Sequence, residues 1–169
     1  ANSTSNWKSF NHKVMASPID GIKIQTNSNS DFYLRYKTWN EGQSYYYPEV
    51  TSLENDYAGY PNKPIQGLSI SAYSKDGTKL TAGVVVMYRA YVDGRWLPWV
   101  SNADPEWMQD VQENYNLGGT LDVSSSYAGI IGKNISSVEI YVFNGKSISS
   151  SIGNLSGGKV ASTLSYMHL

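Results

Sequence analysis

Apolar and polar positions alternate along most of this chain of 169 residues. A period of two places every second side chain on the same side, which is the pattern of a β-strand with one buried face. The alternating stretches are rich in β-branched and aromatic residues, and clusters of Gly, Asn, Asp or Ser separate several of them. The pattern predicts an all-β protein with strands at 21–26, 32–39, 68–73, 83–92, 138–143 and 161–169 and turns at 27–30, 75–77 and 144–145.

One segment has helical spacing instead. An Asp-Pro-Glu sequence beginning at Asp104 supplies an N-cap, a first-turn proline and a first-turn acid. Trp107, Val111 and Tyr115 then fall on one helical stripe. We expect a short helix near 104–117. It either lies on a binding face, as insertions in repeat proteins often do, or closes one end of the core through Trp107.

The chain also contains an internal repeat. Residues 57–70 and 127–140 align without a gap, and both begin Tyr-Ala-Gly. A weaker third copy of the second half lies at 17–24, so the repeated Ile-containing core starts at Ile19, Ile65 and Ile135. Three copies predict a threefold architecture.

The third repeat is divided between the two ends of the chain. We expect one domain, 1–169, with repeats at about 19–64 and 65–134 and a third formed by 135–169 together with 1–18. The last strand would pair beside the first and remove open sheet edges. These features predict a pseudo-symmetric β-prism-like module, with a β-trefoil or a β-sandwich as alternatives.

Charge and hydropathy argue against two classes of partner, nucleic acid and the membrane interior. The 13 basic and 14 acidic residues nearly cancel, and no basic cluster is present, which argues against nucleic acid. The longest apolar run, 84–87, is too short to insert in a membrane. The absence of cysteine and the polar start at 1–6 favour a secreted or cell-surface bacterial protein, either one whose leader was removed or a module of a larger exported protein.

The aromatic composition indicates binding. Fourteen Tyr and five Trp accompany only three Phe, and Tyr and Trp combine an apolar ring with a polar atom. Such rings fit the C–H face of a sugar, while charged or amide neighbours bond its hydroxyls. An aromatic residue stands at the position of Trp96 in each repeat, so Trp96 is expected in the core, whereas Trp99 has Glu49 and Phe10 as counterparts and is expected to be an exposed platform. The predicted ligand-binding residues are Tyr45, Tyr46, Tyr47, Asp93, Arg95, Trp96, Trp99, Asn102 and Trp107.

Catalytic chemistry has weaker support in the sequence. Only His12 and His168 could act as imidazole bases or ligands, and no metalloprotease, nucleophile-elbow, Walker or calcium-loop motif occurs. We therefore predict no catalytic residue, metal site or cofactor. A glycan hydrolase using carboxylates of the 104–113 insertion, and a protein-docking domain, are the alternatives.

The residues at 88–102 and 128–140 carry a family resemblance. They read Tyr-x-Ala-x-Val-x-Gly-x-Trp followed by Trp-Val-Ser-Asn, and Ala-Gly-x-x-Gly-Lys-x-Ile-x-x-x-Glu-Ile. This pattern resembles the clostridial hydrophobic repeat with a signature tryptophan, found in exported proteins of Gram-positive bacteria beside cell-wall hydrolases or adhesion modules. The chain departs from it in the insertion after Val100, in Pro61-Asn62, and in Tyr46 at the tryptophan position. The resemblance implies a noncatalytic, lectin-like carbohydrate-binding module that recognises cell-wall or plant polysaccharide.

Overall fold

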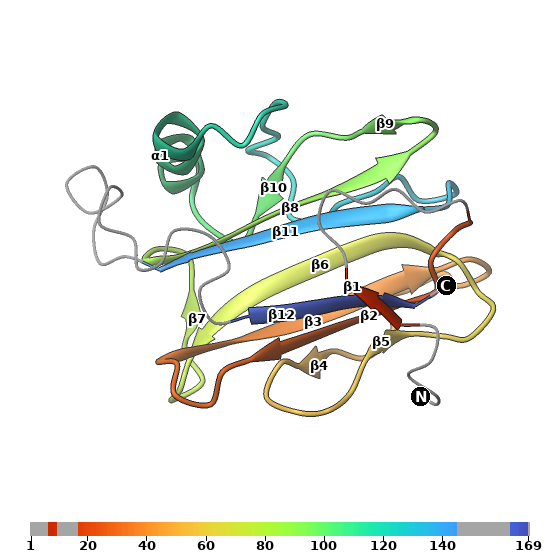
Figure 1. Cartoon of the computed structure of the whole chain (residues 1–169), viewed down its shortest axis with the longest axis horizontal. Helices are drawn as coiled ribbons and strands as arrows, with labels where there is room; N and C mark the ends of the chain where they lie inside the picture. The colour runs from red at the N-terminus through yellow and green to blue at the C-terminus, as the bar shows by residue number, and fades with distance from the viewer. Residues whose placement is uncertain (1–6, 10–16, 145–162, 169) are drawn as a thin grey trace.

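Three antiparallel pairs of long strands form the framework of the protein, in a computed structural model that describes residues 7–9, 17–144 and 163–168 (Figure 1). The pairs are β2 (Gly21–Thr26) with β12 (Thr163–His168), β3 (Phe32–Asn40) with β6 (Ile65–Ser74), and β8 (Val84–Val92) with β11 (Ser137–Asn144). Short strands extend each pair: β1 (Trp7–Ser9), β4 (Val50–Thr51), β5 (Ala58–Gly59), β7 (Lys79–Leu80), β9 (Arg95–Trp96) and β10 (Val100–Ser101).

Each long pair belongs to its own four-stranded sheet. Two of the sheets have the strand orders β1-β12-β2-β5 and β4-β3-β6-β7. The remaining sheet has the order β10-β8-β11, with β9 also paired to β8. The all-β prediction is therefore confirmed, and the described strands agree with the predicted ones to within a few residues. Residues 161, 162, 169 and 145 of the predicted last strand and turn lie outside the described part of the chain.

The chain ends meet in the first sheet. Strand β12 lies between β1 and β2, with Trp7 opposite His168 and Gly21 opposite His168 on the other side. The last strand therefore pairs beside the first ones, as expected from the sequence.

Ile19, Ile65 and Ile135 bind one another through their backbones in a closed ring. The Ile65 amide donates to the Ile19 carbonyl at 2.8 Å, the Ile135 amide to the Ile65 carbonyl at 2.8 Å, and the Ile19 amide to the Ile135 carbonyl at 2.9 Å. All three side chains are fully buried. These are the positions at which the repeated core begins in the sequence, so the repeats meet at this isoleucine ring.

The Tyr-Ala-Gly segments lock each repeat onto another. Ala58 pairs with Ile22 of β2, and Ala128 exchanges both backbone hydrogen bonds with Leu68 of β6. Gly59 and Gly129 have φ of +128° and +112°, and a Cβ on them would lie 2.2 Å and 2.3 Å from a backbone carbonyl oxygen. Only glycine allows both the conformation and the close approach.

The main core fills the space between the three sheets. Inward-facing Ile, Leu, Val and Tyr side chains of β2, β3, β6, β8 and β11 form it around the isoleucine ring. Its alternation with partly exposed positions is clear in β3, where residues 34, 36 and 38 are buried and 35, 37 and 39 are partly exposed. This alternation is the sequence pattern from which the strands were predicted.

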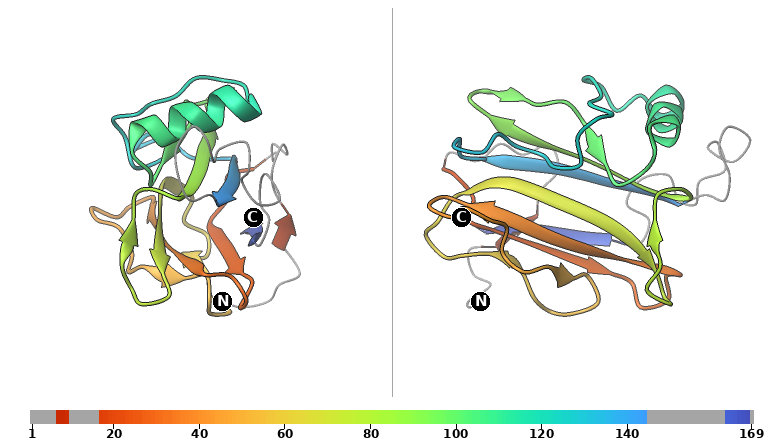
Figure 2. Two further views of the ribbon diagram at one scale, coloured as in Figure 1. Left: turned by 90° about the vertical axis from the view of Figure 1, so that its left-hand side faces the viewer. Right: turned by 180° about the vertical axis from the view of Figure 1, so that it is seen from behind.

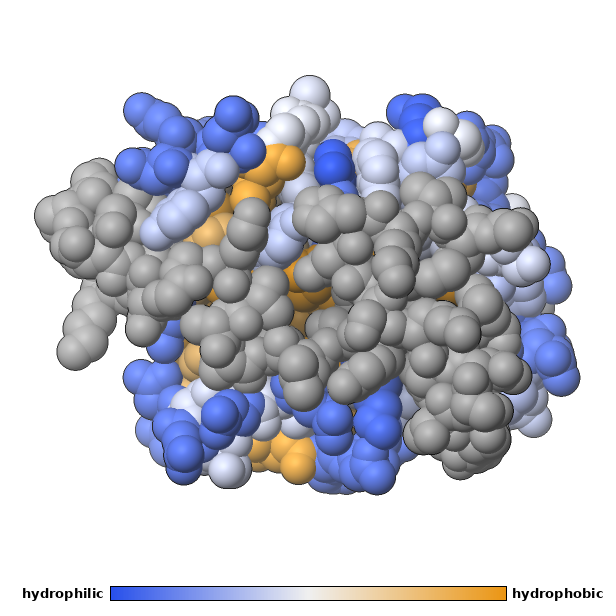
Figure 3. All heavy atoms as spheres, viewed as in Figure 1, coloured by the Kyte–Doolittle hydropathy of each residue, from blue (hydrophilic) through white to orange (hydrophobic). Residues whose placement is uncertain are grey.

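The helix α1 (Pro105–Tyr115) lies over the outer face of the β8–β11 sheet (Figures 1 and 2). Its Trp107, Met108 and Val111 are buried against that sheet. In the space-filling view, hydrophilic side chains gather over the outer side of α1, with apolar residues beside them toward the sheet (Figure 3). The resulting second core comprises Val85, Met87, Trp99, Ala103, Trp107, Met108, Val111, Tyr141 and Phe143.

Candidate functional site

The predicted tryptophan platform is wrong at Trp99. The side chain is fully buried in the second core, its Nε1–H donates to the Gly118 carbonyl at 2.7 Å, and its ring packs against Tyr141. Glu49 stands at the equivalent place in the first repeat, and the helical insertion covers the outer face of the β8–β11 sheet, which holds Trp99. The variation between repeats therefore reflects the insertion and not exposure to ligand.

Trp107 and Asn102 are also unavailable as ligand contacts. Trp107 is only 5% exposed and packs into the second core, so the helix buries it against a sheet face and does not present it. The Asn102 side chain accepts a hydrogen bond from the Val86 amide at 2.8 Å and donates to the Leu80 and Val84 carbonyls at 3.0 Å each. Asn102 therefore holds the chain together where β7 leads into β8.

Trp96 and Trp99 lie on the same side of their sheet, whereas the sequence predicted opposite faces. The Arg89 guanidinium carbon is 4.7 Å from the Trp96 ring centroid and 4.4 Å from that of Trp99. The strand is interrupted between β9 and β10, so strict alternation does not hold across Pro98. Trp96 is partly exposed, contrary to the expectation that it belongs to the core. Its ring packs edge-to-face with the Tyr91 ring, and the two ring centroids are 5.2 Å apart.

Arg89 is anchored by an ion pair that sequence reasoning missed. Its Nη2 lies 2.6 Å from Oε1 of Glu139, and the two side chains are 13% and 1% exposed. The residues face each other directly across β8 and β11. Burial, and then the nearby Glu139 charge, raises the pKa of Tyr141 to about 12. No local motif marks the pair, because it depends on the register of two strands far apart in the sequence.

The first repeat contains a similar cluster without the buried ion pair. The Trp39 and Tyr46 rings pack edge-to-face with their centroids 5.4 Å apart, and the Lys37 ammonium lies 4.9 Å from the Tyr46 ring centroid. All three residues are partly exposed. Tyr46 belongs to the predicted site, and Trp39 could have been found by aligning it with Tyr91 of the second repeat.

Arg95, a predicted ligand residue, lines a pocket of about 240 Å³. Asp122, Ser125 and Tyr127 line it as well, and the Tyr127 side chain is 39% exposed. The Asp122 carboxylate accepts hydrogen bonds from the Ser124 amide and hydroxyl, which orient it. The sequence did not single out these lining residues, since the stretch between Val100 and Tyr127 is about twenty residues longer than its counterpart between Val50 and Tyr57, although Tyr127 opens the repeated segment. The remaining lining comprises Leu97, Pro98, Val100, Ala128, Gly129 and Ile130.

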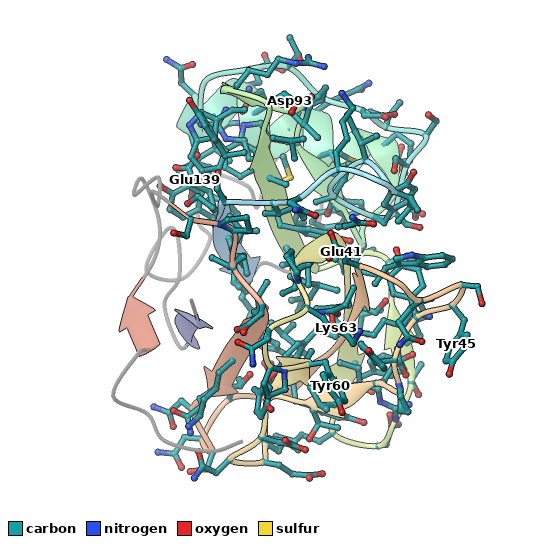
Figure 4. The ribbon with its side chains drawn as sticks, turned by 90° about the vertical axis from the view of Figure 1, so that its right-hand side faces the viewer. Glu41, Tyr45, Tyr60, Lys63, Asp93 and Glu139 are labelled. Atoms are coloured by element: carbon teal, nitrogen blue, oxygen red, sulfur yellow. The ribbon has the colours of Figure 1, made fainter. Side chains whose placement is uncertain are left out.

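Of the other predicted tyrosines, Tyr45 is labelled in Figure 4, which views one end of the molecule. Tyr45 is 60% exposed and points away from the body of the protein. Tyr47 stacks on Tyr60 with ring centroids 6.0 Å apart, and burial is the main cause that raises the pKa of Tyr47. Asp93 lies at the same end, where its carboxylate forms an exposed ion pair with Lys133.

The carboxylates considered for hydrolysis do not converge on this pocket. Asp104 precedes α1 and accepts a hydrogen bond from the Thr81 hydroxyl at 3.4 Å, while Glu106, Asp110 and Glu113 lie along the helix. None of them lines the pocket. Within the described residues, no group of three or more His, Cys, Asp or Glu side chains is placed to hold a metal ion. No helix in that part of the chain is long and apolar enough to cross a membrane.

Comparison of the chain with protein-family models, with curated proteins and with solved structures found no match.

Proposed function

We propose that this protein is a noncatalytic, lectin-like glycan-binding module that binds sugar in the pocket beside Tyr127. The observation that carries the proposal is the pocket itself, whose lining includes an exposed aromatic ring, a cation, an anion and a hydroxyl. Sugars offer an apolar C–H face and a rim of hydroxyls, so they need an aromatic surface and polar groups of both kinds.

Each lining residue then has a distinct part in binding. The Tyr127 ring stacks on the sugar, Arg95 donates hydrogen bonds to ring or hydroxyl oxygens, and Asp122 accepts them from hydroxyls. The volume of about 240 Å³ is below the usual range for drug-sized ligands, which begins at about 300 Å³. A single sugar unit of a longer chain fits this size better than a large compact ligand.

The proposal extends to setting and architecture. The motif resemblance supports an exported bacterial protein, related to the clostridial tryptophan repeats and acting on cell-wall or plant polysaccharide beside other modules. The isoleucine ring and the three long strand pairs support a threefold, prism-like arrangement over a trefoil or a sandwich.

The test is retention of the purified chain on insoluble polysaccharides and on Gram-positive cell walls. Tyr127→Ala and Arg95→Ala should each reduce binding at least fivefold, while Tyr127→Phe keeps the ring and most of the binding. Tyr60→Ala is the matched control, because Tyr60 is 51% exposed and lies outside the pocket lining. Binding to no glycan would overturn the proposal. Release of reducing ends that is lost in Glu106→Gln would overturn its noncatalytic part.

A further inference from the structure

The outer face of β3 and β6 forms an aromatic and cationic surface that the proposed pocket does not use. Alternation directs one set of side chains of each strand outward, and residues directly opposite in the pair lie on the same face. The outward residues of β3 are Tyr33, Arg35, Lys37 and Trp39, and those opposite them in β6 are Tyr73, Ser71, Ser69 and Gly67. Lys79 of β7, opposite Tyr73, adds a third cation at the edge.

The equivalent face of β8 and β11 has a different composition and is covered. Its opposing pairs are Val85 with Phe143, Met87 with Tyr141, and Arg89 with Glu139. The apolar members belong to the second core beneath α1. Seen from behind, β3 and β6 run side by side while α1 lies over the neighbouring sheet (Figure 2). One face is therefore built for packing, whereas the other retains polar groups.

The cations of the uncovered face form no close ion pair with the described acids. Within the described residues, no carboxylate oxygen lies within 4.0 Å of the Arg35 or Lys37 side-chain nitrogens. Ser69 faces Lys37 at the register position where Glu139 faces Arg89. Glu49 acts on the Arg35 charge from a greater distance, and the Arg35 guanidinium donates to the Tyr33 hydroxyl at 2.8 Å. Neither Arg35 nor Lys37 is held in a salt bridge, so both can pair with a ligand carboxylate.

Aromatic rings lie at both ends of the same face, although Tyr33 is only 8% exposed and its hydroxyl holds the Arg35 side chain. Tyr33 and Tyr73 stack with centroids 5.8 Å apart, and the Arg35 guanidinium carbon is 3.9 Å from the Tyr73 centroid. At the other end are Trp39 and Tyr46. With a rise of about 3.4 Å per residue, the strand from Tyr33 to Trp39 covers about 20 Å, which is long enough for several sugar units.

The face continues toward the pocket. A Cβ on Gly67, between the two regions, would lie 3.0 Å from Cδ1 of Ile131 and 3.4 Å from the Tyr46 hydroxyl. Ile131 is 41% exposed and follows Ile130, which lines the pocket. A chain leaving the pocket past this segment therefore reaches Tyr46 and the end of the uncovered face.

We propose that the outer face of β3 and β6 binds a linear polysaccharide that carries carboxylate groups, as an extension of the pocket beside Tyr127. The inference rests on the proposed glycan binding and adds the ligand class and its direction along the sheet. Arg35 and Lys37 pair with carboxylates, Ser69 and Ser71 bond hydroxyls, and the partly exposed Trp39 ring stacks on a sugar face.

The test compares binding of polygalacturonate, its fully methyl-esterified form and polyglutamate. The wild type should bind polygalacturonate best, and the double variant Arg35→Gln with Lys37→Gln should weaken that binding about five- to tenfold, since each exposed ion pair contributes modestly. Lys23→Gln is the matched control, because Lys23 lies mid-strand on the outward side of β2 in another sheet. The Trp39 indole N–H signal in NMR spectra should shift on titration, while that of buried Trp107 should not.

The outcomes separate this inference from the proposed function. Equal binding of the ester and the acid, or an unchanged affinity of the double variant, overturns the anionic face but leaves a Tyr127-dependent glycan site intact. Equal binding of polyglutamate shows that charge alone suffices and overturns the glycan assignment of this face. Failure to bind any glycan overturns both proposals.

Discussion

The Tyr36 hydroxyl accepts a hydrogen bond from the Ile24 backbone amide at 3.0 Å, and so joins β3 to β2 of the neighbouring sheet. Tyr88 makes the same bond to the Ile70 amide at 3.1 Å, from β8 to β6 of the next sheet. Both tyrosines are fully buried and occupy the same place in their repeats. The polar atom of each side chain therefore links two sheets inside an apolar core.

Loss of either hydroxyl should destabilise the fold. Tyr36→Phe and Tyr88→Phe keep the ring but leave a buried amide without its partner, at a cost of about 1–3 kcal/mol each. Urea unfolding followed by circular dichroism measures the change. Tyr73→Phe, on the partly exposed outer face, is the control and should cost less than about 0.5 kcal/mol. An equal loss in all three would contradict the special role of the buried pair.

Alkaline pH should unfold the protein through the same residues. Burial is the main cause that raises the pKa of Tyr36 and Tyr88 well above its usual value, and it raises that of Tyr46 to about 12. Unfolded tyrosine ionises near about pH 10, so the unfolded chain loses protons first and stability falls as pH rises from about 10 toward 12. Below about pH 10 this contribution is fully present.

Urea midpoints measured between about pH 8 and about pH 11 should decline above about pH 10. Tyr88→Phe should reduce the decline, because one of the buried groups responsible for it is removed. A flat profile in the wild type would refute this account.

Replacing only one partner of the buried Arg89–Glu139 pair should destabilise the fold strongly. Glu139→Gln leaves a largely buried guanidinium between two indole rings without its counter-ion, and we expect a loss of about 3 kcal/mol. Replacing both, with Arg89→Met and Glu139→Gln, removes the uncompensated charge and should recover part of that loss. A double variant less stable than the single one, in the same urea assay, would show that the guanidinium stabilises by packing alone.

Sequence patterns located the strands because they report local alternation. They also singled out Ile19, Ile65 and Ile135, whose backbones bond to one another in the structure. They could not place Trp99, since its burial depends on how an inserted helix packs against a distant sheet. Trp99 and Glu49 do occupy equivalent positions, but they differ because the inserted helix packs over Trp99. Variation between repeats predicts exposure only where the repeats have the same surroundings.

The sequence named only some of the residues that form the proposed site. Arg95 and Tyr46 were predicted because they lie in or beside aromatic strands, and the structure leaves Tyr46 partly exposed and Arg95 exposed. Asp122 and Ser125 were missed because the pocket forms only when their loop folds against Arg95 and Pro98. The outer face of β3 and β6 could have been found from alternation alone, by comparing the outward residues Arg35 and Lys37 with Met87 and Arg89.

Truncation of Trp107 should affect stability without affecting glycan binding. Trp107→Ala removes a large side chain that is only 5% exposed in the second core, and comparable core truncations cost about 3–5 kcal/mol. The pocket and the outer face of β3 and β6 contain no atom of Trp107, so the folded fraction should bind polysaccharide as the wild type does. Binding is therefore measured at low temperature, with the folded fraction determined by circular dichroism. Trp107→Phe retains much of the packing and serves as the milder control. A variant that stays folded but no longer binds polysaccharide would show that the helix contributes to the binding site.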